Sequence, residues 1–232
     1  MNKRRVLLVP AVLLILLAAA CTSPQPLPTA PTAIPTLIPA TMPPPVAATV
    51  PPAAQNVIFP AAAPSAQAGE AIYQAKCANC HGADGQGQVE KARDFSDVDY
   101  LRAAAPVDFF QTITGGKDQM PAFRSELSDE ERWNVTFFLW SFAVKADELG
   151  RGKAVFETHC VACHAADGSA AIPQTPKLTN VEFIASHPAT EFYQAVSGGK
   201  GIMPAWQDRL SPEERWAAVE YGRAFAYQPM GR

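Results

Sequence analysis

The sequence contains no charged residue from Ala20 through Gly69, although Asp, Glu, Lys and Arg make up 18% of the chain. The same stretch is rich in proline, and thirteen of the 22 prolines lie between Pro24 and Pro64. A segment with so much proline and neither charge nor an apolar pattern cannot form a packed core and favours an extended, solvated linker. We therefore predict a linker over residues 21–65 and place the folded part after it.

An excess of basic residues is also absent, since 19 Lys and Arg stand against 22 Asp and Glu. A protein that binds nucleic acid needs positive charge to neutralise phosphates. The two Gly-Gly-Lys segments have neither the spacing nor the Ser or Thr of a phosphate-binding P-loop. We therefore expect no nucleic-acid partner.

A long apolar segment is missing as well. The apolar run from Val6 to Ala20 is shorter than the roughly 20 residues that cross a bilayer. It follows the basic residues 3–5 and ends in three alanines, which is the pattern of a secretory signal peptide. We predict a signal peptide over residues 1–20 and an extracytoplasmic protein, in the periplasm or on the outer face of the cytoplasmic membrane.

Cys21 directly follows these small residues, and this arrangement resembles a bacterial lipoprotein signal, in which the cysteine is lipidated and becomes the first residue. Ala18 stands where such signals usually have leucine. Ordinary cleavage after Ala20 also fits, and it would leave Cys21 with a free thiol. We favour lipidation at Cys21, which makes the linker a tether between the membrane and the folded part.

The folded part is a tandem duplication. When the sequence is shifted by 83 positions against itself, residues 69–142 align with residues 152–225 without a gap, and 24 of the 74 positions are identical. Each copy has about 80 residues, near the size at which an apolar core alone becomes marginal. We predict one domain over residues 66–146 and another over residues 147–232, each stabilised by something besides burial.

Most of each copy is predicted to be helical. Residues 69–76 and 148–159 are expected to form short helices that lead into cysteine motifs. Ser128 and Ser211 each begin a Ser-x-x-Glu capping box, which predicts a helix start at both positions. The apolar residues after the first box have the i, i+3, i+4, i+7 spacing of a buried helical face, namely Val135, Phe138, Leu139 and Phe142.

Each copy contains one Cys-x-x-Cys-His motif, the pattern that attaches haem c. The motif residues are Cys77, Cys80 and His81 in the first copy and Cys160, Cys163 and His164 in the second. One turn of chain holds two thiols where they form thioethers with the haem vinyl groups, and the histidine that follows reaches the iron as proximal ligand. The sequence therefore predicts two covalently attached haem c groups.

Three other kinds of site also use paired cysteines. A thioredoxin-like redox pair needs a βαβ context, which this sequence lacks. A zinc site pools four ligands from two such pairs, and a structural disulfide suits an oxidising compartment. Neither the zinc site nor the disulfide explains why histidine follows the second cysteine in both copies, so we favour haem.

A methionine lies at the same distance after each motif. Met120 and Met203 both stand 39 residues after the motif histidine, between Gly-Gly-Lys-x-x and Pro-Ala. Core filling does not explain two methionines in identical surroundings, and the proline that follows restricts the methionine backbone to extended conformations. We predict these methionines as the second axial ligands. His159 and His187 occur in one copy only and are the weaker candidates.

These motifs resemble those of class I cytochrome c, and two such domains cover the region from about Ala66 to Gln228. The resemblance implies an all-α fold of two tandem small cytochrome c domains, each wrapped around a covalent haem c. The axial ligand pairs that it implies are His81 with Met120 and His164 with Met203.

The resemblance also bears on the surroundings of the proximal histidines. In the family, a proline after the motif gives its carbonyl to the proximal imidazole, and Pro176 matches that proline in the second copy. Arg93 stands at the aligned position of the first copy. The family pattern therefore predicts this hydrogen bond, which tunes ligand basicity, at His164, and it gives no such prediction for His81.

Histidine and methionine together fill both axial positions, which leaves no open site for peroxide, oxygen or nitrite. We therefore predict an electron carrier, not an enzyme, with no small-molecule substrate: a membrane-tethered dihaem cytochrome between respiratory or photosynthetic redox complexes. The expected partners are redox proteins, namely a quinol-oxidising complex, a dehydrogenase or a terminal oxidase. The alternatives are a haem subunit fixed in an oxidoreductase complex and a dihaem enzyme such as a peroxidase or a sulfur-compound oxidoreductase.

Overall fold

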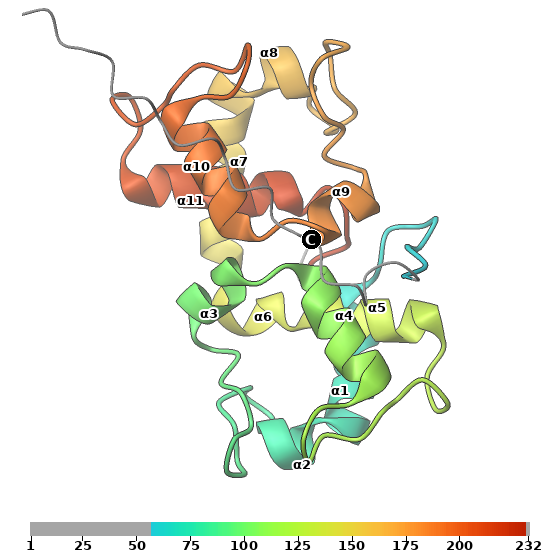
Figure 1. The fold of residues 1–232 in the computed structure, drawn as a ribbon. Coiled ribbons are helices and arrows are strands. Elements are labelled where there is room, and N and C mark those ends of the chain that lie inside the picture. The colour runs from blue at the N-terminus through green and yellow to red at the C-terminus, as the bar shows by residue number, and fades with distance from the viewer. Residues whose placement is uncertain (1–56, 231–232) are drawn as a thin grey trace, which may run out of the picture. The chain divides into compact units, whose positions relative to one another are not determined.

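A computed structural model describes residues 57–230, and within this range the fold is helical, with isolated bridges and no strand (Figure 1). The helices of the first repeat are α1 (Ala66–Lys76), α2 (Ala78–His81), α3 (Val98–Ala103), α4 (Pro106–Gly115), α5 (Asp129–Phe138) and α6 (Trp140–Ala143). Those of the second repeat are α7 (Ala146–His159), α8 (Val161–His164), α9 (Val181–Ala185), α10 (Ala189–Gly198) and α11 (Pro212–Arg223). The prediction of an all-α fold is confirmed.

Both predicted capping boxes are present, at the starts of α5 and α11. The Ser128 hydroxyl accepts a hydrogen bond from the Glu131 amide at 3.2 Å, and the Glu131 carboxylate accepts one from the Ser128 amide at 2.8 Å. Ser211 and Glu214 repeat both bonds at the same distances. Each box satisfies amides that the first turn of a helix leaves without partners, so both helices begin where the sequence predicts.

In each repeat the N-terminal helix crosses the C-terminal helix at a glycine. α1 packs on α5 at Gly69, and α7 packs on α11 at Gly152. A side-chain carbon at Gly69 would stand 2.1 Å from the Asn134 carbonyl oxygen, and one at Gly152 would stand 2.0 Å from that of Ala217. These distances are far inside van der Waals contact, so the helices approach this closely only because glycine has no side chain.

Alanine at Gly152 should therefore destabilise the second repeat. We expect Gly152→Ala to lower the free energy of unfolding by about 1–3 kcal/mol, because the added carbon displaces the α11 backbone. Gly150→Ala on the same helix is the control, since no atom lies within 4 Å of its added carbon. It should stabilise the protein by up to about 1 kcal/mol through helix propensity. Denaturant unfolding of the haem-loaded variants measures both effects, and equal stability of the two would contradict the close helix crossing.

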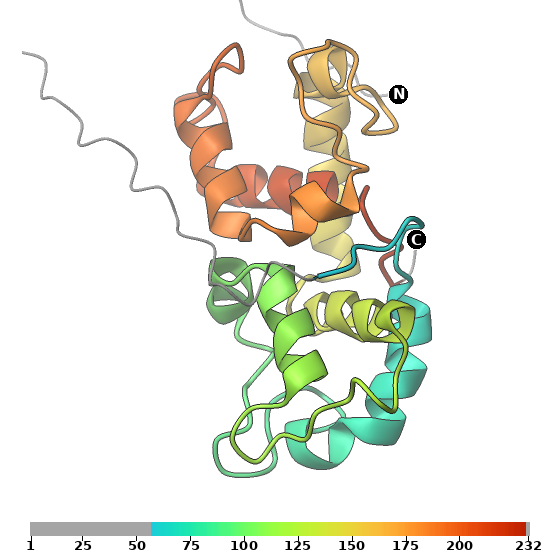
Figure 2. The ribbon, with the colours of Figure 1, turned by 45° about the vertical axis from the view of Figure 1, so that its right-hand side comes forward.

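The two repeats share one hydrophobic core. A cluster of buried side chains draws on both of them, with Phe110, Trp133 and Phe137 from the first repeat and Phe156, Ile184 and Tyr227 from the second among its members. α3 contacts α10 and α4 contacts α9, and both pairs meet where the green and orange segments adjoin in Figure 2. The described residues accordingly fall within a single compact unit.

A buried network of ion pairs crosses the same junction. Arg102 on α3 donates to Glu220 on α11 at 3.0 Å and to Glu148 on α7 at 2.7 Å. Glu220, which is 1% exposed, also accepts a hydrogen bond from Arg223 at 3.1 Å. The Arg102 guanidinium lies over the Trp216 ring, 4.2 Å from its centroid. Because buried charges are tolerated only when they are paired, this network ties the first repeat to the second.

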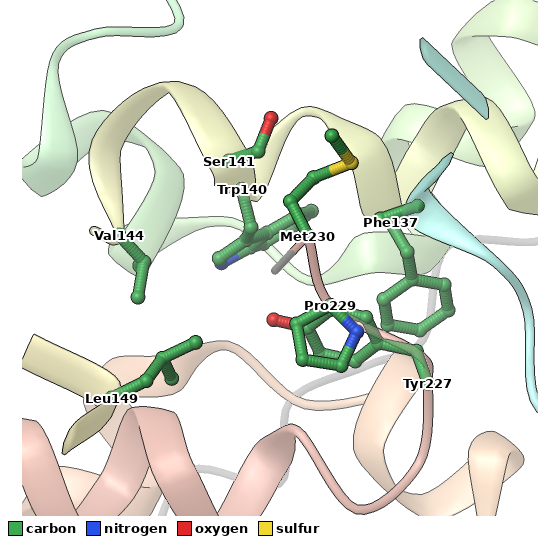
Figure 3. A pocket seen from close by; sticks show the side chains of 9 residues that line it. Phe137, Trp140, Ser141, Val144, Leu149, Tyr227, Pro229 and Met230 are labelled. Atoms are coloured by element: carbon green, nitrogen blue, oxygen red, sulfur yellow. The ribbon is translucent and has the colours of Figure 1, made fainter. Parts of the chain in front are cut away.

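A small pocket lies beside the junction (Figure 3). Its walls come from both repeats and from the C-terminal tail, namely Ala66, Phe137, Trp140, Ser141, Val144, Leu149, Tyr227, Pro229 and Met230. Its volume of about 20 Å³ holds about one water molecule. This pocket therefore has no room for haem.

The first described residues pack on the fold. The Trp133 indole donates a hydrogen bond to the Ile58 carbonyl at 2.9 Å, and the Phe59 ring stacks on Trp133 with 5.5 Å between centroids. These contacts involve the last part of the predicted linker, whereas Cys21 and the predicted signal peptide lie outside the described residues. No helix within residues 57–230 has the length and apolar character needed to cross a membrane.

Candidate haem-binding sites

Each Cys-x-x-Cys-His motif forms a helical turn at the end of a longer helix. The Cys77 amide closes α1 on the Tyr73 carbonyl at 2.8 Å, and the His81 amide closes the next turn on the Cys77 carbonyl at 2.9 Å. The second motif repeats these bonds at 2.9 and 3.0 Å. Figures 1 and 2 show the two motif turns, α2 and α8, at opposite ends of the described unit. The two candidate sites are therefore separate.

No disulfide joins any of the four motif cysteines in this structure. Burial raises the pKa of Cys77 and of Cys160 to about 11, so both thiols are protonated at neutral pH. A catalytic or redox-active cysteine has the opposite shift, toward a lower pKa. The surroundings of these thiols thus do not favour a thioredoxin-like role.

The arrangement also disfavours a zinc site shared by the two motifs. Cysteines on α2 and α8, at opposite ends of the unit, cannot supply four ligands to one ion. Within the part of the chain that the structure describes, no three His, Cys, Asp or Glu side chains gather as a metal site would require. Each motif is therefore a candidate site of its own.

Both motif histidines favour the neutral form that binds iron. Burial lowers the pKa of His81 and of His164 below the ordinary value of an imidazole. A neutral imidazole keeps a nitrogen lone pair available for a metal. The two side chains are thus suited to be proximal ligands.

The hydrogen bonding of these imidazoles differs from the family-based prediction. Nδ1 of His81 lies 3.4 Å from the Arg93 carbonyl oxygen, and the His81 ring stacks on Phe95 with 4.8 Å between centroids. Arg93 aligns with Pro176. Its backbone carbonyl can accept this hydrogen bond as a proline carbonyl does, because every residue has a backbone carbonyl. Nδ1 of His164 is buried and has no hydrogen-bond partner among the described residues. The prediction of this bond at His164 is therefore wrong in this structure, and His81 has the contact that the family pattern did not predict.

Both predicted methionine ligands lie in tight turns. Lys117 and Met120 exchange backbone hydrogen bonds of 3.0 and 2.8 Å. Lys200 and Met203 exchange bonds of 3.1 and 3.0 Å in the second repeat. The two turns therefore hold their methionines in the same local backbone geometry, as the identical spacing predicts.

A glycine before each turn shapes it, a role that the sequence analysis missed. Gly116 and Gly199 have φ angles of 73° and 79°, in the left-handed region that favours glycine. A side-chain carbon at Gly116 would lie 2.6 Å from the Met120 carbonyl oxygen, and one at Gly199 would lie 2.8 Å from that of Met203. The Gly-Gly-Lys sequence of both copies could have indicated this turn, because nothing else in the sequence explains why each copy has the second glycine.

In the first repeat the structure brings the motif and the methionine onto one apolar surface. Cys77 and Met120 both pack against a buried cluster made of Ile113, Phe123, Leu127 and Val135. In the second repeat Cys160 packs against the core shared by the two repeats. The clusters of the described residues do not bring Met203 and Cys160 together in the same way.

These donor sets fit haem c. Each repeat offers two thiols for thioether bonds, an imidazole on the same turn and a methionine sulfur on a separate turn. In the first repeat the apolar wall shared by Cys77 and Met120 also suits an apolar macrocycle. No other residue types are needed to complete a six-coordinate iron site.

The other two histidines make contacts of a structural kind. The His159 ring packs on Trp206 with 5.2 Å between centroids. Nδ1 of His187 lies 2.8 Å from the Phe183 carbonyl oxygen, one helical turn earlier. Neither contact points toward an iron ligand.

Comparison with known proteins assigns both repeats to one family. The family model for the cbb3-type cytochrome c oxidase subunit III matches residues 64–139 and again residues 147–221. The cbb3-type cytochrome c oxidase subunit CcoP of Rubrivivax gelatinosus is 33% identical over 159 residues, which are 65% of this chain and 52% of that protein. The subunit FixP of Bradyrhizobium diazoefficiens is 28% identical over 170 residues, which are 66% of this chain and 58% of that protein.

The chain thus spans about half the length of the curated relatives that it matches. The match includes both Cys-x-x-Cys-His turns and both methionine turns. The chain therefore belongs to the family of the cbb3-type cytochrome c oxidase subunit III and is a dihaem c-type cytochrome.

Proposed function

We propose that this protein is a membrane-tethered carrier that passes electrons between redox proteins outside the cytoplasm. The observation that carries the proposal is the repeated pairing of a Cys-x-x-Cys-His turn with a methionine turn at one fixed distance. Bound haem supplies one-electron chemistry between the ferrous and ferric states of iron. The chain supplies the ligands and the surroundings that set the potential.

Eight residues are proposed to hold the two haems, four in each repeat. They are Cys77, Cys80, His81 and Met120 in the first repeat and Cys160, Cys163, His164 and Met203 in the second. A thioether ligand favours the reduced state and raises the potential, and two occupied axial positions leave no site for oxygen or peroxide. We therefore assign no catalytic residue.

The proposed partners are respiratory redox proteins. The relatives are named as subunits of a cbb3-type oxidase, which supports a terminal oxidase as the acceptor. A quinol-oxidising complex or a dehydrogenase is proposed as the donor. The names of the relatives also favour a second form of this function, in which the chain stays fixed as a subunit of an oxidase complex. Purification of the native protein from solubilised membranes separates the two forms. A fixed subunit should co-purify with the rest of an oxidase complex, whereas a carrier should not.

A redox assay tests the carrier function itself. Chemically reduced protein should deliver two electrons per chain to ferricyanide, because each repeat is proposed to hold one haem. The reduced protein should bind carbon monoxide only slowly, and the protein should not turn over peroxide, because methionine occupies the sixth position. Rapid carbon monoxide binding with peroxide turnover would identify an enzyme instead.

The tether is proposed to begin at a lipidated Cys21. If so, the protein should partition with membranes, and Cys21→Ser should release it into the soluble fraction or block its processing. Stable anchoring needs more than one acyl chain, because a single chain binds membranes only marginally. Mass spectrometry of the N-terminal peptide checks the modification. A soluble wild-type protein that starts at Cys21 with a free thiol would show ordinary signal cleavage.

A further inference from the structure

In each repeat one loop carries the proposed methionine ligand between two helices. Residues 116–128 join α4 to α5 in the first repeat and contain Met120. Residues 199–211 join α10 to α11 in the second repeat and contain Met203. Groups that fix the ends of such a loop restrict where its methionine sulfur can lie, as supporting hydrogen bonds orient the ligands of other metal sites.

In the second repeat the Arg215 side chain joins the two ends of this loop. Its Nη1 donates a hydrogen bond to the Ser197 hydroxyl at 2.6 Å, in the last turn of α10. Its Nε donates one to the Ser211 carbonyl at 3.4 Å, at the N-cap of α11. Arg215 is 9% exposed and lies over the Tyr193 ring of α10, 5.0 Å from its centroid. Burial excludes the water that would compete for these bonds, so they connect the helix before the loop with the helix after it.

Ser197 is also bonded through its backbone. Its carbonyl accepts hydrogen bonds from the Trp206 and Gln207 amides, both at 3.2 Å, and these two residues belong to the loop. The carbonyl of the aligned Thr114 accepts a longer bond, from the exposed Arg124 side chain at 3.4 Å. Ser197 is therefore a point at which the second loop is held from two sides.

The first repeat has the same kinds of residue at these positions but lacks the bond between them. Arg132 aligns with Arg215, and Thr114 aligns with Ser197. Arg132 is 5% exposed and, like Arg215, lies over an aromatic ring of the preceding helix. Within residues 57–230, Nε and Nη1 of Arg132 and the Thr114 hydroxyl are buried and have no hydrogen-bond partner. Buried polar groups without partners are unfavourable, so something must keep this pair apart.

The cause is one difference at the first position of the helix after the loop. Arg132 donates through Nη2 to the carboxylate of Asp129, three residues earlier on α5. Pro212 aligns with Asp129, and it offers Arg215 no carboxylate. Asp129 thus engages its arginine within α5, whereas nothing at the corresponding position draws Arg215 away from α10.

We propose that Arg215 is a positioning residue for the iron ligand Met203 and that it acts by joining α10 to α11 across the ends of the loop. The Met120 loop lacks this support, because Asp129 engages Arg132. A methionine sulfur can leave the iron only if its loop moves, so the loop that is fixed at both ends should release it more slowly. This inference rests on the proposed assignment of the methionines as axial ligands, and it adds a residue that lies outside both the haem motif and the methionine turn.

Displacement of the methionine by cyanide measures how firmly the loop holds it. In a Met120→Ala background the methionine–iron charge-transfer band of the ferric protein comes from the second haem alone. There Ser197→Ala should speed the loss of the band about tenfold, because a hydrogen bond to a charged group is removed. Ser197→Thr keeps the hydroxyl and should leave the rate within twofold. Thr114→Ala in a Met203→Ala background is the matched control, and it should also change the rate less than twofold.

Exchange of the residues at the first helical position provides the second test. Pro212→Asp gives Arg215 a carboxylate and should speed the loss of the band of the second haem. Asp129→Pro removes the carboxylate from Arg132, and proline is favoured at the first position of a helix. It should slow the loss of the band of the first haem, in the Met203→Ala background. A slower loss cannot arise from damage to the fold, so this variant separates positioning from stability.

The outcomes separate this inference from the ligand assignment. Equal effects of Ser197→Ala and Thr114→Ala, in proteins that still show the band, would overturn the role of Arg215 and leave the ligands as proposed. An unchanged rate in both Pro212→Asp and Asp129→Pro would overturn it as well. If the Met120→Ala protein shows no charge-transfer band, the assignment of the second methionine as a ligand fails, and the proposed function fails with it.

Discussion

Met203→Ala should convert the second haem from low-spin to high-spin while the first haem stays low-spin. Removal of the thioether sulfur opens one axial position, so the altered haem should bind carbon monoxide quickly and lose its methionine–iron charge-transfer band. Its potential should fall by on the order of 0.1 V, because axial ligands are a main determinant of haem potential. Met120→Ala should have the same effects on the first haem. Electron paramagnetic resonance measures the spin state of each haem, and redox titration measures its potential.

Met230→Ala is the control for lost packing. Met230 is a half-buried methionine of the C-terminal tail that packs against the first repeat and lines the small pocket (Figure 3). Its truncation removes the same atoms without touching either candidate site, so both haems should stay low-spin. If the haems also stay low-spin in Met120→Ala and Met203→Ala, the methionines are not the ligands, and His187 becomes the next candidate in the second repeat.

Glu220→Gln should be among the most destabilising single substitutions in the folded part. The change leaves Arg102 and Arg223 buried at the junction without the carboxylate that they share. Breaking a buried ion pair by removing one partner costs about 3–5 kcal/mol. Calorimetry of the haem-loaded protein should show one cooperative transition for the wild type, because the repeats share a core, and two separated transitions for the variant.

Glu157→Gln is the matched control. Glu157 pairs with Lys153 at 3.7 Å on the exposed face of α7, where both side chains are more than half exposed. Exposed pairs contribute little to stability, so the unfolding midpoint should hardly move. If Glu220→Gln behaves like Glu157→Gln, the buried network does not hold the two repeats together.

The parts of the site that follow from covalent chemistry could be predicted from the sequence. Thioether attachment requires two thiols one turn apart with histidine next, and this requirement is visible in the order of residues alone. The capping boxes at Ser128 and Ser211 are equally local, because four consecutive residues contain both partners. Periodicity was less informative, since Val135, Phe138 and Leu139 are buried but Phe142 is half-buried, and all of residues 132–140 are buried whatever their spacing.

Features that depend on contacts between distant segments could not be predicted in this way. Glu220 aligns with Phe137 of the first repeat, and no local pattern shows that a carboxylate at this position meets Arg102 from the other repeat. The hydrogen bond at His81 was missed because the family pattern points to proline, whereas the contact needs only a carbonyl, which Arg93 provides. Prediction from the sequence failed for these two contacts because they depend on where the folded chain places each group and not on residue type.

The central claim is that two haems are covalently attached, one in each repeat, and the mass of the denatured chain tests it most directly. After acid and organic extraction, the wild-type chain should retain two haems. Cys77→Ala combined with Cys80→Ala should leave one, and that haem should map to the peptide that contains Cys160 and Cys163. A wild-type chain that releases its haem on extraction, or a colourless chain loaded with zinc, would contradict the account.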